Sequence, residues 1–281
     1  MIDSYLRPAK IDHALAALAD RRRVIVAGGT DFYPQRVGKP LTGAVLDITA
    51  LQELKGICED RDVYRIGALT TWTDVIHAPL PAWFDGLKLA GREVGGVQVQ
   101  NAGTVGGNIC NASPAADGTP NLLALDAVVE LRSARHTRTL PLAEFVTGNR
   151  RTNRKPDELV TAILVPKPPD RACSTFLKLG PRKYLVISIV MVAAVLATSD
   201  DGSVTHARFA VGACSAVAQR LPALESELLG RQAGPALAAL VEARHLSPLS
   251  PIDDIRATAR YRHDAALILV RRAVGTLSRH A

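Results

Sequence analysis

The stretch NAGTVGGNICNASPAADGTP at residues 101–120 constrains the fold more than any other segment of this chain. Seventeen of its twenty residues are Asn, Ala, Gly, Thr, Ser, Pro or Asp, whose side chains are too small or too polar to build a hydrophobic core. Gly106 and Gly107 let the backbone approach a ligand closely, and Thr104 and Asn108 can hydrogen-bond to it. The stretch therefore predicts a binding loop, with a self-packed Ω-loop as the alternative.

A second glycine turn, AGGTDFYP at residues 27–34, directly follows a predicted strand. Consecutive backbone N–H groups in such a turn can converge on a phosphate, although a plain turn capped by Thr30 or Asp31 is the alternative. Neither turn matches the GxGxxG fingerprint or the GxxxxGK phosphate loop. Asp117 adds a carboxylate, which a phosphate repels but a sugar hydroxyl can use as an acceptor. Two glycine turns and one acid together predict a nucleotide-shaped ligand.

The composition argues against several classes of function. The 281 residues, 47% of them hydrophobic, can bury the core of one large domain or two ordinary ones. The net charge of +7 is spread along the chain and aromatic residues make up only 4%, so we expect no nucleic-acid binding. One basic cluster is a candidate for docking an acidic partner subunit; it consists of Arg150, Arg151, Arg154 and Lys155.

The four cysteines are too far apart for a metal or iron–sulfur site made by this chain, with separations of 52, 63 and 41 positions between Cys58, Cys110, Cys173 and Cys214. We expect Cys110 to be a small buried residue. The sequence begins without the apolar segment of an export signal, so the cytoplasm is the expected location. The longest apolar run, residues 184–198, is shorter than the roughly 20 residues of a membrane span and predicts a buried strand.

Hydrophobic periodicity predicts an alternating order of helices and strands, with a division near residues 168–172. The expected domains are residues 1–168, with subdomains of about 1–50 and 51–168, and residues 172–281. Helices are predicted at 11–19, 72–77, 83–94, 121–125, 221–230, 235–246 and 261–277, and strands at 24–27, 44–48, 63–69, 128–131, 159–166, 173–179, 184–198 and 204–214.

The pair AGGTDFYP and TVGGNICNASPAADGTP resembles the flavin-binding medium subunit of the molybdenum hydroxylases, the xanthine dehydrogenase and carbon monoxide dehydrogenase family. The resemblance covers the whole chain. It implies an α+β fold: a vanillyl-alcohol-oxidase (PCMH) type FAD-binding domain of two α/β subdomains, followed by a smaller C-terminal domain with an antiparallel sheet and helices. FAD is then the only cofactor expected on this chain.

The resemblance also implies site residues. The first turn would wrap the pyrophosphate of FAD, the second stretch would contact it again, and Asp117 would bind the sugar part. Val160 would touch the flavin ring or adenine, and Lys178 would lie near the ring. The resemblance leaves open which residue covers the ring, and the candidates are Tyr33 and Tyr184. The full set is Ile25, Val26, Ala27, Gly28, Gly29, Thr30, Asp31, Phe32, Thr104, Gly106, Gly107, Asn108, Asp117, Val160 and Lys178, with no catalytic and no metal-binding residue.

As a family member, the chain would be an oxidoreductase subunit that passes electrons from an iron–sulfur small subunit through flavin to NAD or another acceptor. A large subunit would carry molybdopterin, and the complex would be a dimer of heterotrimers. Two alternatives remain open: a self-sufficient flavin oxidase or reductase, and a non-enzymatic basic assembly subunit.

Overall fold

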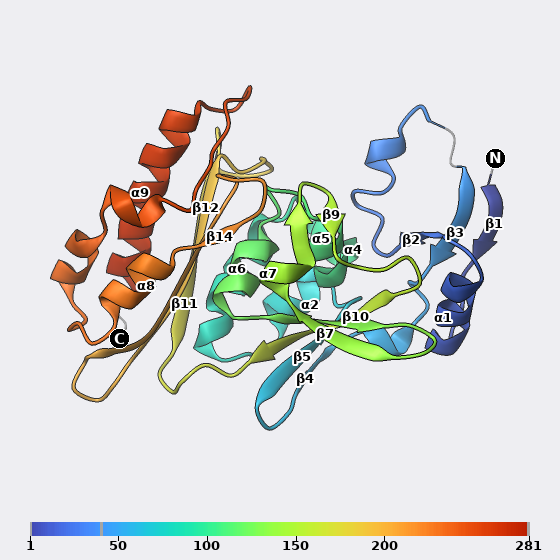
Figure 1. Cartoon of the computed structure of the whole chain (residues 1–281), viewed down its shortest axis with the longest axis horizontal. Coiled ribbons are helices and arrows are strands. Elements are labelled where there is room, and N and C mark those ends of the chain that lie inside the picture. Colours follow the sequence, from blue (N-terminus) through green and yellow to red (C-terminus); the bar gives the residue numbers. More distant parts are fainter. Residues whose placement is uncertain (1, 40–41, 280–281) are drawn as a thin grey trace.

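The structure, a computed structural model, describes residues 2–39 and 42–279, and arranges three sheets in succession across the molecule (Figure 1). The N-terminal sheet is parallel, in the order β1-β3-β2. Its core is formed with the apolar face of α1, which begins at Ile11 because apolar residues recur there at helical spacing. The elements are β1 (Ile2–Leu6), α1 (Ile11–Asp20), β2 (Val24–Val26) and β3 (Gly43–Asp47).

The central sheet is antiparallel, in the order β4-β5-β10-β6-β7, and lies in the middle of the molecule (Figure 1). Its strands are β4 (Ile57–Glu59), β5 (Val63–Gly67), β6 (Val128–Arg132), β7 (Thr137–Pro141) and β10 (Leu159–Pro166). The segments between β5 and β10 supply α2 (Trp72–His77), α3 (Asp85–Glu93), α4 (Val97–Ala102), α5 (Val105–Asn111), α6 (Gly118–Ala124), α7 (Leu142–Phe145) and a hairpin of β8 (Val146–Gly148) and β9 (Arg151–Thr152).

The C-terminal sheet is antiparallel, in the order β11-β12-β13-β14, and is covered on both faces. Alternate residues of β12 enter two different cores: Met191 and Ala193 join the core of the central part, whereas Val192 and Ala194 join the core under α9. This double burial explains why β12 is apolar at every position except the last, Thr198, which is also buried. The elements are β11 (Cys173–Leu179), β12 (Val190–Thr198), β13 (Val204–Gly212), β14 (Gln219–Arg220), α8 (Pro222–Leu228) and α9 (Ala259–Leu277).

The predicted α+β architecture is confirmed, and α2, β10 and β11 have the predicted bounds. The second glycine stretch is mostly helical, because Thr104 caps α5 through a hydrogen bond from the Gly107 amide and α6 begins at Gly118. Both the open binding loop and the Ω-loop were therefore wrong as descriptions of its backbone. Residues 184–189 are not part of the buried strand, since Tyr184 and Ile187 are exposed. Residues 235–246 form two 3-10 helices instead of an α-helix.

Across the two described ranges, no helix is both long and apolar enough to span a bilayer.

Candidate functional site

The first glycine turn presents a run of unused backbone donors. Gly29 turns the chain at a φ of +72°, and within residues 2–39 and 42–279 no acceptor is found for the amide N–H groups of residues 28–32. The 3-10 helix η1 (Pro34–Arg36) follows only after Tyr33 and has no side-chain cap, so the alternative of a turn capped by Thr30 or Asp31 is not what the structure contains. Consecutive free amides in a turn can bind an anion where their N–H groups converge.

The two glycine stretches lie against each other. A Cβ atom on Gly28 would be 1.7 Å from the carbonyl oxygen of Ala102, so only glycine permits this approach of the first turn to the end of α4. At the other end, Asn111 donates from Nδ2 to the carboxylate of Asp31, and Gln35 Nε2 donates to the same carboxylate over 3.2 Å. The structure therefore brings together stretches that are some seventy-five positions apart in the sequence.

The glycines of the second stretch serve the packing of the chain itself. The Gly106 amide donates to the Ala68 carbonyl over 3.1 Å, and a Cβ atom on Gly106 would be 2.6 Å from that oxygen. The Gly107 amide donates to Thr104 Oγ1 over 3.0 Å. These amides are thus already used, and their contact with a ligand stays a prediction.

Asn108 leaves an unused polar atom in this region. Its Oδ1 is buried and has no hydrogen-bond partner among the described residues, although most buried polar atoms have one. A Cβ atom on Gly118 would be 2.8 Å from this oxygen, which places it between α5 and α6. Because this oxygen is buried between two helices of the chain, its contact with a ligand stays a prediction.

Asp117 and Lys178 form a buried ion pair. Lys178 Nζ lies 2.7 Å from Asp117 Oδ2 and 3.3 Å from the Glu93 carbonyl, and Ser188 Oγ donates to Asp117 Oδ1 over 2.8 Å. Burial raises the pKa of the Asp117 carboxyl above its ordinary value, while Lys178 and the hydrogen bond from Ser188 oppose that shift. The two predicted residues are thus brought together, at the contact between the central helices and the C-terminal sheet.

The remaining predicted residues lie in strand β2, in the core of β10 or at the surface. Ile25 and Val26 lie in β2 and Ala27 follows it, whereas Val160 is a buried core residue of β10 opposite Leu131. Tyr33 and Tyr184, the two candidates for covering a flavin ring, are both exposed. The expectation for Cys110 is confirmed only in part: the residue is exposed at the surface, yet burial raises the pKa of its thiol to about 11, as expected of an unreactive cysteine.

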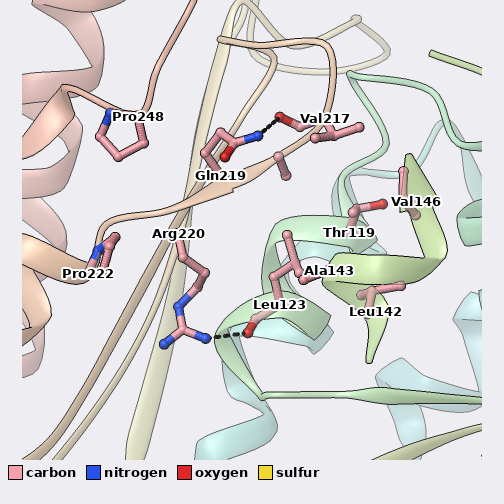
Figure 2. A pocket seen from close by; sticks show the side chains of 11 residues that line it. Thr119, Leu123, Leu142, Ala143, Val146, Val217, Gln219, Arg220, Pro222 and Pro248 are labelled. Atoms are coloured by element: carbon pink, nitrogen blue, oxygen red, sulfur yellow. Dashed lines mark hydrogen bonds between the residues drawn. The ribbon is translucent and has the colours of Figure 1, made fainter. Parts of the chain in front are cut away.

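A separate cavity lies between α6, α7 and β14, and its volume is about 290 Å³ (Figure 2). Its lining is mainly aliphatic, and Arg220 extends along it to donate to the Leu123 carbonyl over 3.0 Å. None of the predicted site residues lines it. Within the described residues there is also no group of three or more His, Cys, Asp or Glu side chains that could hold a metal ion.

The free amide donors of the first glycine turn are compatible with the diphosphate of FAD. The amides of residues 28–32 are donors of the kind that the acceptor oxygens of a diphosphate need. The sequence did not point to Gln35 or Arg150 as parts of this region, whereas Asn111 was expected as a side chain of the second stretch that can hydrogen-bond to a ligand. Their signal is tertiary, because all three join hydrogen bonds between segments far apart in the sequence.

Comparisons with known proteins point the same way. Residues 1–168 match the family model of the FAD binding domain in molybdopterin dehydrogenase, and residues 175–277 match that of the CO dehydrogenase flavoprotein C-terminal domain. The chain is 33% identical to the nicotinate dehydrogenase FAD-subunit of Eubacterium barkeri, over 80% of this chain and 79% of that one. It is 30% identical to the nicotine 6-hydroxylase medium subunit of Paenarthrobacter nicotinovorans, over 96% and 95%.

A solved structure agrees with these matches. The reconstituted CO dehydrogenase from Oligotropha carboxidovorans contains a chain that superposes with a TM-score of 0.91 at 26% identity, covering 100% of this chain and 99% of that one.

Proposed function

This chain belongs to the FAD-binding subunits of the molybdenum hydroxylase family, and from that premise we propose that it passes electrons from an iron–sulfur subunit to an external acceptor such as NAD. In this proposal a third subunit with a molybdenum cofactor oxidises the organic substrate, and the complex is a dimer of heterotrimers. The four cysteines are free thiols, which is consistent with a reducing compartment such as the cytoplasm.

One observation supports the proposal most strongly: the run of free amides at residues 28–32, packed against the second glycine stretch. These amides would hold the diphosphate of FAD. Thr104, Gly106, Gly107 and Asn108 would form the other wall, and Ile25, Val26 and Ala27 would position the turn at the end of β2. Val160, a core residue of β10, would contact the flavin ring or the adenine.

The buried pair of Asp117 and Lys178 would face the ribityl chain and the ring. Asp117 can accept from sugar hydroxyls, and the ammonium group of Lys178 lies beside it in a region of low dielectric. A positive charge at that place favours a negatively charged ring. Bound FAD itself supplies the chemistry, since it can exchange one or two electrons.

The role of the chain is therefore to bind and to orient. None of the predicted site residues needs to act as a general acid or base, because electron transfer between cofactors requires only that they be close and correctly oriented. Asp117, the one buried carboxylate among them, is already paired with Lys178 and Ser188. This supports a subunit over a self-sufficient oxidase, which would need a substrate base on this chain.

Spectroscopy and turnover of the purified chain test the proposal. We expect an absorption band at about 450 nm from bound oxidised flavin, one FAD per chain, and no oxidation of organic substrates by the chain alone. A colourless, stably folded chain would indicate an assembly subunit, and substrate oxidation without partners would indicate a self-sufficient oxidase. Mass spectrometry and metal analysis of the native complex should identify iron and molybdenum on other chains.

A further inference from the structure

The predicted diphosphate site has no positive side chain. Among residues 25–32 and 104–108 the only charged residue is Asp31, which is negative. The free amides contribute partial charges, but a diphosphate brings negative charge on both phosphates to a turn that already holds a carboxylate. A cation close to this turn would therefore matter for affinity.

Arg150 is placed to supply that charge. Its Nη1 donates to Asn111 Oδ1 over 2.6 Å, and the amide of the same Asn111 side chain donates to the Asp31 carboxylate. Gln35 Nε2 lies 3.5 Å from Asn111 Oδ1 and completes the group. The guanidinium is exposed, and among the described residues Nη1 is its only nitrogen with an acceptor.

The backbone holds Arg150 at this place as well. Its amide donates to the Ala112 carbonyl over 2.9 Å, which joins the turn between β8 and β9 to the end of α5. Both residues have a left-handed backbone, with φ of +55° at Arg150 and +49° at Ala112. Non-glycine residues rarely adopt this conformation, so the surrounding structure must hold it.

Two other cations close to predicted site residues, Arg36 and Lys178, are already engaged. The Arg36 guanidinium stacks over the Phe32 ring at 3.9 Å and donates to the Phe32 carbonyl over 2.8 Å. Lys178 is paired with the buried Asp117. Arg36 also keeps unused donors, but its guanidinium is half-buried against the Phe32 ring, whereas that of Arg150 is exposed and linked to Asp31 through Asn111.

We propose that Arg150 is a binding residue for FAD: its guanidinium, held by Asn111, neutralises the diphosphate, offsets Asp31, and makes the site select ligands that contain a diphosphate. This inference rests on the proposed function. It also gives one member of the basic cluster a ligand-binding role in place of partner docking.

Ligand titrations on the flavin-free full-length chain test the assignment. FAD, ADP and riboflavin are each titrated at low and high salt, with Arg150→Met to remove the charge and Arg150→Lys to retain it. Arg171→Met is the matched control, because Arg171 also has a left-handed backbone (φ +63°) and an exposed side chain, but pairs with Asp200. We expect Arg150→Met to weaken FAD and ADP by about 10- to 100-fold and to reduce the salt dependence, with riboflavin unchanged.

Arg150→Lys should lose less affinity than Arg150→Met, and Arg171→Met should behave as wild type. Equal losses for riboflavin and FAD would mean a structural role, and no loss would mean that the guanidinium does not reach the diphosphate; either result overturns the inference. A wild-type chain that binds neither FAD nor ADP would instead contradict the proposed function. Melting curves of each variant verify that the turn is still folded.

Discussion

Lys178 Nζ lies 2.7 Å from Asp117 Oδ2, and this buried pair joins the C-terminal sheet to the start of α6. Replacing Lys178 by Met would leave a carboxylate buried without its counter-charge. We expect a loss of about 3–5 kcal/mol in the free energy of unfolding at neutral pH, measured by urea denaturation. A matched Arg171→Met variant breaks an exposed ion pair and should cost less than about 1 kcal/mol.

The pH dependence of the Lys178→Met variant follows from the raised pKa of Asp117. A carboxyl whose folded pKa lies above the unfolded value of about 3.9 binds its proton more tightly in the folded state, so stability falls as the pH rises through this window. Without Lys178 the folded pKa rises further. The difference in the free energy of unfolding between the wild type and Lys178→Met should therefore become smaller as the pH is lowered. A double variant that also carries Asp117→Asn should not show this pH dependence. A deficit independent of pH would contradict the charge explanation.

For Asp254 we expect the opposite dependence of stability on pH. Hydrogen bonds from Arg256, and then from Arg262, hold the pKa of this carboxyl well below its usual range. Its stabilising contribution is complete above the unfolded pKa of about 3.9 and is lost as the pH falls from there toward the lower folded pKa. We expect Asp254→Asn to lower the melting temperature at pH 7. As the pH falls from about 4 to about 2, the variant should lose less stability than the wild type. Parallel acid-unfolding curves would show that Asp254 is not involved.

Gly28→Ala tests the contact between the two glycine stretches. A Cβ atom at this place would be 1.7 Å from the Ala102 carbonyl, so the first turn has to move away from α4. We expect a cost of about 1–3 kcal/mol in stability together with a loss of bound FAD, measured by absorbance after gel filtration. Gly275→Ala in α9 is the control, because the nearest atom to its Cβ would be 3.7 Å away. Wild-type FAD content in Gly28→Ala would refute the contact as a requirement for binding.

Gly106 is a poorer place for the same test. Its Cβ would meet the backbone of Ala68, so a larger residue would disturb α5 and the central sheet whether or not FAD binds there. Loss of flavin from such a variant would report on folding as much as on binding. The sequence pattern alone does not distinguish the two, because Ala68 lies 38 positions before Gly106.

The parts that the sequence predicts best are those whose local pattern agrees with their tertiary surroundings. β10 and β11 are continuous runs of strand-forming residues and have the predicted bounds. α5 was missed because Gly and Asn disfavour helices; the Thr104 cap, hydrogen bonds to Ala68 and Thr70, and burial of Val105 and Ile109 in the central core hold it. The resemblance named Asp117 and Lys178 one by one. Their ion pair, and the hydrogen bonds that tie Arg150 and Asn111 to Asp31, depend on segments that meet only in the folded chain.

A crystal structure of the chain with FAD tests the central claim most directly. We predict that the diphosphate lies within hydrogen-bonding distance of the amides of residues 28–32, between the first turn and the second glycine stretch. Flavin bound elsewhere, for example in the cavity beside Arg220, with these amides left free, would contradict it.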